Sequence, residues 1–269
     1  TGNAGIDKNQ YSYYGSSDGI GVYGSVSTLD ILNNVIGNYE TTQIEFWNAS
    51  GSNVTIQGNY LDVGADGTTD ISNSATAIES ADNSAALRFG GSISISNLVI
   101  GGTGAGEGNI IANNDNLGVF ILNSQATSFV GNTVYGNVSA GIRIDSGATS
   151  VSILQNSIHS NGGIGIDLGT DGVTANDAGD GDSGANNLLN FPVLNSLTAS
   201  GTSLFYDLNL DAATNADGYR IEFFVSDAAS ATGNGSGETY LGYLDVTGPG
   251  ADTNYTGTLT MSQSLSSGD

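Results

Sequence analysis

Cysteine is absent from this chain of 269 residues, and histidine occurs only once, at His159. Without cysteine, the chain can form neither a disulfide framework nor a thiol-based catalytic site. With a single histidine and no evident nucleophile beside it, the sequence offers no Ser-His-Asp constellation. No apolar run approaches the roughly 18 residues that a membrane-spanning helix requires, so we expect no membrane insertion.

Basic residues are scarce as well, with 4 Lys and Arg against 27 Asp and Glu, which gives a formal net charge of −23. Such a surface repels phosphate backbones and anionic lipids, so nucleic acids and membrane surfaces are excluded as partners. It attracts hard cations, above all calcium, because these prefer carboxylate and carbonyl oxygens. The alternative is that the acidity only keeps a large surface soluble.

Glycine, in contrast, is abundant, and a repeat of similar units runs through the chain. The units are Ile20–Asn38, Ile44–Asn59, Leu87–Gly101, Val119–Asn137 and Ile142–Asn161, with a sixth that starts at Ile164. The spacing is 24 residues from Ile20 to Ile44, 23 from Val119 to Ile142 and 22 from Ile142 to Ile164, but 43 residues separate Ile44 from Leu87. We therefore expect one degenerate unit around Thr76–Glu79.

Each unit reads as three short strands, because apolar residues alternate with polar ones between Gly, Ser and Asn turns. A unit of this kind cannot bury its apolar face alone, whereas stacked units bury a continuous core. The pattern predicts an all-β solenoid of about six to seven coils. An asparagine follows the second strand at Asn33, Asn59, Asn132 and Asn156. We expect these asparagines to take a left-handed bend and to hydrogen-bond in a ladder.

Three segments carry a family resemblance: Asn59–Asp70, Ile100–Asn114 and Gly163–Leu194. They resemble the right-handed parallel β-helix repeats of bacterial surface proteins, adhesin-like and secreted. The likeness covers most of residues 19–194, and it implies a small immunoglobulin-like β-sandwich after the helix. Tyr219–Asp227 and Thr239–Val246 look similar to strands of that sandwich. The resemblance implies an adhesive or filament-like role and carries over no catalytic residues.

The chain is thus expected to divide into three parts. Residues 1–18 form an N-terminal cap or a preceding segment, residues 19–190 the parallel β-helix and residues 191–269 the sandwich. Phe191 and Pro192 mark the boundary, because proline ends the coil pattern and starts an extended connection. Related sandwiches continue for one or two more strands, so we expect an incomplete sandwich with an open edge.

Two carboxylates and an arginine are the candidates for catalysis. Aligning the first strands predicts two outward columns: Gly21, Glu45, Arg88, Phe120, Arg143, Gly165, and Tyr23, Trp47, Gly90, Leu122, Asp145, Asp167. Asp145 and Asp167 are then one rung apart, about 5 Å. With Arg143 beside them, they would suit a polysaccharide lyase or glycoside hydrolase of the β-helix class. The alternative is a solvated acidic pair.

Tyr23 and Trp47 are predicted to be exposed aromatic side chains one rung apart. Such platforms stack on sugar rings or on partner proteins. The alternative is that the segment Thr1–Tyr14 covers them as a cap, because solenoid ends need caps.

The best candidate for ion binding is the glycine-rich segment that ends the coils. Its ligands would be Asp171, Asn176, Asp177, Asp180 and Asp182. Closely spaced carboxylates on a flexible loop supply the six to eight oxygens that Ca²⁺ prefers. The alternative is an ion-free linker, and a weaker cluster is Asp62, Asp66 and Asp70.

These observations predict a non-catalytic structural or adhesive module of a large secreted or cell-surface protein or filament, of bacterial type and stabilised by Ca²⁺. Its expected partners are other copies, adjacent domains of the same assembly, or a polysaccharide. The rival predictions are the carbohydrate-active enzyme and a carbohydrate-binding module.

Overall fold

The computed structural model describes residues 18–39, 41–72, 84–124, 127–169, 172–230, 232–247 and 252–265. This part of the chain is all-β: it contains nineteen strands and one short 3₁₀ helix. None of its helical segments is long and apolar enough to cross a membrane. Most of the predicted N-terminal cap, the expected unit at Thr76–Glu79 and the predicted ligand Asp171 lie outside the described residues.

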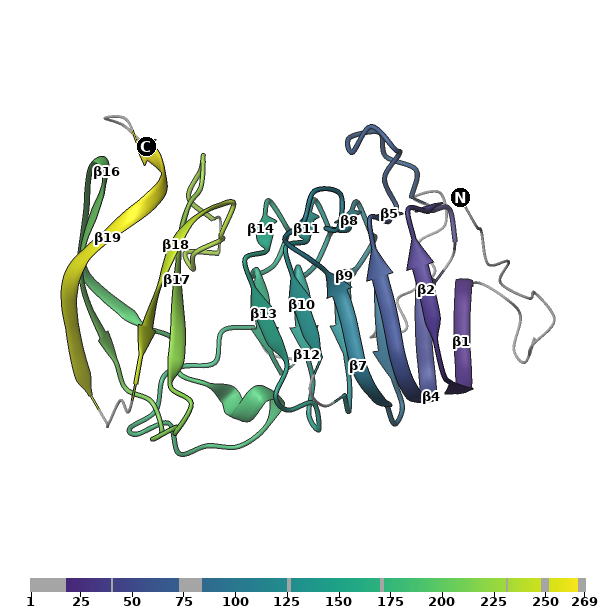
Figure 1. Ribbon diagram of the computed structural model, residues 1–269, viewed down its shortest axis with the longest axis horizontal. Helices are drawn as coiled ribbons and strands as arrows, with labels where there is room; N and C mark the ends of the chain where they lie inside the picture. Colours follow the sequence, from purple (N-terminus) through teal and green to yellow (C-terminus); the bar gives the residue numbers. More distant parts are fainter. Residues whose placement is uncertain are drawn as a thin grey trace.

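The strands between residues 18 and 168 pair in parallel and follow one another in three series (Figure 1). The first series is β1 (Asp18–Val26), the first half of β4 (Thr42–Gln57), β6 (Ala85–Gly90), β9 (Leu117–Ile121), β12 (Ile142–Ile144) and β15 (Ile166–Leu168). The second is β2 (Leu29–Leu32), the second half of β4, β7 (Ser94–Gly101), β10 (Ser128–Val130) and β13 (Ser152–Leu154). The third is β3 (Val35–Ile36), β5 (Tyr60–Leu61), β8 (Ile110–Ala112), β11 (Thr133–Tyr135) and β14 (Ser157–His159).

Each successive stretch of chain therefore adds one strand to each series, as expected for stacked coils. The described residues supply five complete coils and the first strand of another, fewer than the predicted number. Ile44 pairs directly with Leu87, so no coil separates these two units and the prediction of a degenerate unit between them is wrong. After β5 the described residues form a short excursion from the coil, in which Val63 and Asp70 make an isolated antiparallel bridge.

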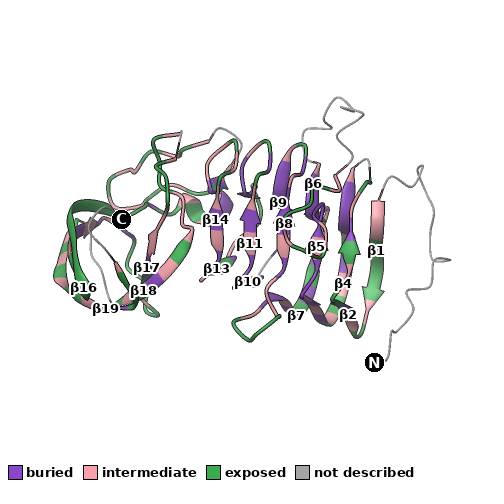
Figure 2. Ribbon diagram, turned by 90° about the horizontal axis from the view of Figure 1, so that it is seen from above, coloured by how far each residue is buried: buried purple, intermediate pink, exposed green. Residues whose placement is uncertain are grey.

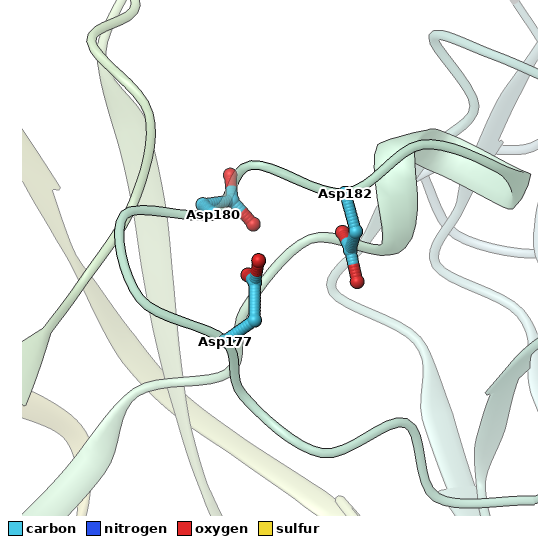
Figure 3. Close-up of side chains that lie close together, drawn as sticks. All are labelled: Asp177, Asp180 and Asp182. Atoms are coloured by element: carbon cyan, nitrogen blue, oxygen red, sulfur yellow. The ribbon is translucent and has the colours of Figure 1, made fainter.

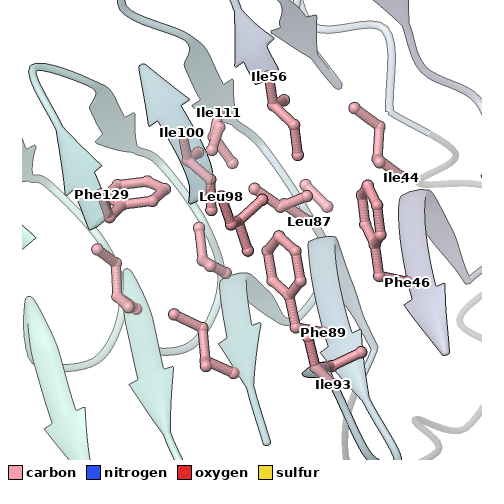
Figure 4. Close-up of a cluster of buried hydrophobic side chains, with 14 of the residues drawn as sticks. Ile44, Phe46, Ile56, Leu87, Phe89, Ile93, Leu98, Ile100, Ile111 and Phe129 are labelled. Carbon is pink, nitrogen blue, oxygen red and sulfur yellow. The ribbon is translucent and has the colours of Figure 1, made fainter. Parts of the chain in front are cut away.

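The core lies between the series and is built from the inward residues of the alternating pattern (Figure 4). Phe46 and Phe89 are fully buried on neighbouring strands, and their rings stack with 5.1 Å between centroids. Each such buried side chain stabilises the fold by about 1.5–3 kcal/mol relative to exposure. In Figure 2 the buried residues are concentrated in the strands of the coils.

The predicted asparagine ladder is present, although its geometry differs from the expectation. Asn59, Asn109, Asn132 and Asn156 are linked in sequence by side-chain hydrogen bonds of 2.9, 2.8 and 3.1 Å. The left-handed residue is the one before the ladder position, as at Gly58 and Gly131, each with φ 66°. Asn33 is itself such a bend residue, and its neighbour Asn34 donates to Asn59.

After the last coil come the 3₁₀ helix η1 (Ala185–Leu188) and four longer strands, β16 (Val193–Leu210), β17 (Tyr219–Val225), β18 (Thr239–Val246) and β19 (Thr253–Leu265). β16 pairs with β19 and β17 with β18, both antiparallel, and all four contribute to a second apolar core. β16 folds back at Gly201, where φ is 58°, so that Asn195 reaches Asp207 at 2.9 Å.

The four strands lie at the end of the coils opposite β1 (Figure 1). Backbone contact between the two parts is made by Ile158, whose N–H donates to the carbonyl of Gly237 at 2.6 Å. The backbone N–H of Gln155 donates to Glu222 Oε2 at 2.8 Å. The predicted boundary at Phe191 falls between η1 and β16.

Candidate functional site

Three carboxylates converge in the loop between β15 and β16. One oxygen from each of Asp177, Asp180 and Asp182 lies within 4.8 Å of the other two (Figure 3). Oδ1 of Asp182 is buried and accepts no hydrogen bond from the residues that the structure describes. Desolvation, and then the negative charges of Asp177 and Asp180, raise the pKa of Asp182. The loop therefore holds mutually repelling charges at one point.

Backbone hydrogen bonds hold this loop in shape and attach it to the β16 end of the chain. The backbone N–H of Asn190 donates to Asp180 Oδ1 at 2.8 Å, and Ala213 N–H donates to Asp180 Oδ2 at 3.2 Å. Gly179 N–H donates to Asp211 Oδ2 at 3.0 Å. The start of the loop is attached to β15 by Thr174 Oγ1, which donates to the carbonyl of Leu168 at 3.1 Å, so the loop contacts both the last coil and the segment after β16.

The geometry of the three carboxylates fits a hard cation. Ca²⁺ binds oxygens at about 2.3–2.6 Å, so ligands on opposite sides of the ion are about 5 Å apart. The three carboxylate oxygens lie within 4.8 Å of one another, so all three can contact one such ion. Of the other predicted ligands, Asn176 binds the peptide of Phe191 through both its amide atoms, at 2.8 and 3.0 Å.

Two residues that organise this loop were not among the predicted site residues. Asn190 accepts from the N–H of Asp177 at 3.0 Å and donates to the carbonyl of Asp211 at 2.7 Å. Asp211 directly follows β16 and lies 32 residues after Gly179, whose N–H donates to it. No local spacing in the sequence connects it to the cluster.

A second group of charged side chains runs along the first series of strands. The pairing sequence there is Gly21, Glu45, Arg88, Phe120 and Arg143, as the first predicted column requires. Arg88 Nη1 lies 2.8 Å from Glu45 Oε1, and its guanidinium lies 4.8 Å from the Trp47 ring centroid. Arg143 lies 4.8 Å from the Phe120 centroid. These are cation–π contacts that tie neighbouring coils together.

The predicted pairing of Asp145 with Asp167 is wrong by two residues. Ile166, and not Ile164, opposes Ile142, so Asp167 is the strand partner of Arg143. Asp145 lies beyond the end of β12, with Oδ2 at 3.7 Å from Arg143 Nη2. The arginine is thus bound to an aromatic ring and a carboxylate, and the two aspartates do not share a rung.

Tyr23 and Trp47 are strand partners on β1 and β4, as predicted. Tyr23 is 40% exposed, and its hydroxyl donates to Glu45 Oε2 at 2.8 Å. Burial, followed by the bond to Glu45, raises the pKa of Tyr23. Trp47 is half-buried, and its indole lies over Gly90. The pair thus offers aromatic surface beside a carboxylate.

An apolar cavity of about 660 Å³ lies between the last coil and the following strands. Its walls include Ile153 and Ile166 from the coil, with Leu210 and Phe224 from the opposite side. Glu222 also lines it, and the Oε1 atom of this residue is buried without a hydrogen bond from any described residue.

No protein-family model matches the chain, and no solved structure matches it either. The resemblance to the β-helix proteins of bacterial surfaces therefore stays a prediction from the residues.

Proposed function

We propose that the chain is a structural or adhesive module of a large secreted or cell-surface protein. In this proposal, a right-handed parallel β-helix carries a small immunoglobulin-like sandwich, and Ca²⁺ stabilises the joint between them. The observation that carries the proposal is the loop at that joint. Its three carboxylates converge in the segment after β15, where backbone N–H groups donate to carboxylates and attach the loop to Asn190 and to Asp211, directly after β16.

The parallel series support the mechanical part of this function. Each coil adds about 4.8 Å to the length, so five coils extend over about 24 Å. Because every coil packs on its neighbours through a continuous core and an asparagine ladder, bending would break several contacts at once. Such an element keeps whatever lies at its two ends at a fixed separation.

The acidic loop supports the role of calcium. Asp177, Asp180 and Asp182 repel one another, and one oxygen of Asp182 is buried without a hydrogen bond from the described residues. A bound Ca²⁺ would supply positive charge there. Since Asp180 also accepts hydrogen bonds from Asn190 and Ala213, fixing its carboxylate fixes the connection to the sandwich.

A carbohydrate-binding module is the second candidate function. It is favoured by the adjacency of Tyr23 and Trp47 on neighbouring strands, since aromatic faces stack on sugar rings. The enzyme alternative has less support, because Arg143 is engaged by Phe120 and Asp145 and the predicted carboxylate pair is separated.

The joint is tested by measuring thermal unfolding in Ca²⁺ and in EGTA. We expect Ca²⁺ to raise the Tm of the full chain. The substitution Asp182→Asn should remove most of the increase in Tm that comes from Ca²⁺ binding at this loop. Asp217→Asn is the matched control, because Asp217 is exposed in a turn of the same half of the chain. A Ca²⁺ response that is equal in the wild type and in Asp182→Asn would contradict a calcium-bound joint.

The mechanical role requires a second measurement. Small-angle scattering should give one fixed distance distribution with Ca²⁺ and a broader one when Asp182 is replaced. A distribution unaffected by both calcium and the substitution would show that the loop does not control the joint.

A further inference from the structure

A small polar pocket lies in the N-terminal half of the coils, where β5 ends. Its volume is about 20 Å³, and it is lined by Asp62, Asp115, Gln43, Asn114 and hydroxyl side chains that include Tyr39 and Ser84. Asp62 directly follows β5, Gln43 lies at the start of β4, and Asn114 and Asp115 follow β8. β4, β5 and β8 belong to the N-terminal half of the coils (Figure 1), so the pocket joins segments of different coils.

Asp62 is the most unusual group in this pocket. It is only 1% exposed, and its Oδ2 accepts a hydrogen bond of 2.9 Å from Asn114 Nδ2. Its Oδ1 is buried and receives no hydrogen bond from the residues that the structure describes. A buried carboxylate oxygen without a partner is costly, because the hydration it had in water is not replaced.

The electrostatic surroundings add to this cost. Burial raises the pKa of Asp62 to about 7, and the charges of Asp115 and Asp70 act in the same direction, while the bond from Asn114 opposes them. Burial and Asp70 also raise the pKa of Asp115. Two carboxyl groups that lose hydration beside each other need either a proton or a cation.

The size and chemistry of the pocket favour a cation. A site needs roughly 10–15 Å³ to hold a particle of the size of a water molecule, so about 20 Å³ admits one ion and excludes organic ligands. Carboxylate, amide and hydroxyl oxygens form the walls, with no histidine or cysteine among the described lining residues. Hard cations prefer this donor set, and Ca²⁺ tolerates irregular arrangements better than Mg²⁺ does.

We propose that this pocket binds one Ca²⁺ ion, with Asp62 Oδ1 and the Asp115 carboxylate as charged ligands and Gln43 Oε1 as a neutral ligand. The site is distinct from the acidic loop, because its residues belong to coils that lie far from β15 along the stack. A bound ion would link the end of β5 to the start of β4 and to the turn after β8. It would thereby stabilise the N-terminal half of the coils independently of the joint.

Calorimetric titration of the full chain with Ca²⁺ tests the proposal. We expect Asp62→Asn to remove one binding event or weaken it at least tenfold, while Asp182→Asn leaves that event within threefold of the wild type. Asp30→Asn, an exposed aspartate on β2, is the control and should change nothing. If Asp62→Asn unfolds the chain, Asp115→Asn serves instead, because Asp115 is exposed and less critical for folding.

Terbium luminescence gives an independent measurement. Tb³⁺ in this pocket should be excited through Tyr39, so Tyr39→Phe should remove most of the tyrosine-sensitised emission that disappears in Asp62→Asn. Ca²⁺ binding that is identical in the wild type, Asp62→Asn and Asp115→Asn would overturn the proposal and leave a protonated Asp62. Loss of Ca²⁺ binding in Asp182→Asn alone would also overturn the proposal. That result would support only a calcium site at the joint.

Discussion

Arg88 lies between Glu45 and Trp47, with its Nη1 at 2.8 Å from the carboxylate and its guanidinium at 4.8 Å from the indole centroid. Glu45 is 7% exposed, and burial raises its pKa while Arg88 lowers it. One of the 4 basic residues of the chain, Arg88, therefore compensates the charge of a buried carboxylate.

Replacing Arg88 by methionine should destabilise the chain by about 2 kcal/mol, because Glu45 would remain buried without its cationic partner. Urea unfolding measures the change. Arg220→Met is the matched control, since Arg220 pairs with Asp245 at 2.7 Å on a more exposed surface, where a pair contributes about 0–1 kcal/mol. Equal losses in the two variants would show that the position of Arg88 has no special importance.

Asn132→Ala should also be strongly destabilising. The side chain accepts two hydrogen bonds from Asn109, at 2.8 and 3.0 Å, and donates to Asn156 at 3.1 Å. Its loss leaves the buried N–H of Asn109 without its acceptor and removes one of the two hydrogen bonds to Asn156 Oδ1, at about 2–3 kcal/mol in total. Asn254→Ala, which removes one exposed bond from Asn209, should stay within about 0.5 kcal/mol in the same unfolding experiment. A small loss for Asn132 would contradict the structural importance of the ladder.

Much of this fold follows from the sequence, because the residues that determine it lie close together. The alternation around Ile44 and Phe46 predicts their burial, and the pairing of Tyr23 with Trp47 follows from the aligned repeats. The error at Ile164 arose because glycine-rich turns between coils vary in length without changing the pattern. A shift of two residues keeps the same faces inward, so alternation alone cannot detect it.

The candidate sites were less predictable. Asp177, Asp180 and Asp182 are close in sequence, so composition indicated them. The pocket at Asp62 brings together residues that are 71 positions apart, such as Gln43 and Asn114. Only the stacking of coils places them together, and the sequence shows no feature that marks Gln43 as a lining residue.

The pKa of Asp62 predicts how stability depends on pH in the absence of metal. The folded value of about 7 exceeds the ordinary value of 3.8, so between these values the folded chain binds more protons than the unfolded chain. The contribution of Asp62 is therefore fully present below pH 4 and is lost as the pH rises to about 7. By linkage it amounts to up to about 4 kcal/mol.

This dependence is measured by urea unfolding in EGTA between pH 4 and pH 8, with the wild type compared with Asp62→Asn. The difference between the two curves should change from pH 4 to about pH 7 and level off toward pH 8. With saturating Ca²⁺ the change should shrink, because the ion favours the ionised carboxylate. Parallel curves in EGTA would contradict the raised pKa.

Gly90→Ala should displace the one tryptophan of the chain. A Cβ at position 90 would overlap Cε3 and Cζ3 of the Trp47 indole, so the ring must move away from the strand. The emission of Trp47 should then shift to longer wavelength, because the half-buried indole becomes more exposed, and the stacking with Arg88 should weaken. Gly235→Ala is the control, since a Cβ there meets nothing within 4 Å.

If Trp47 binds sugar rings, Gly90→Ala should also lower the affinity for polysaccharide while Gly235→Ala leaves it unchanged. An unshifted emission spectrum would show that the indole does not rest on Gly90.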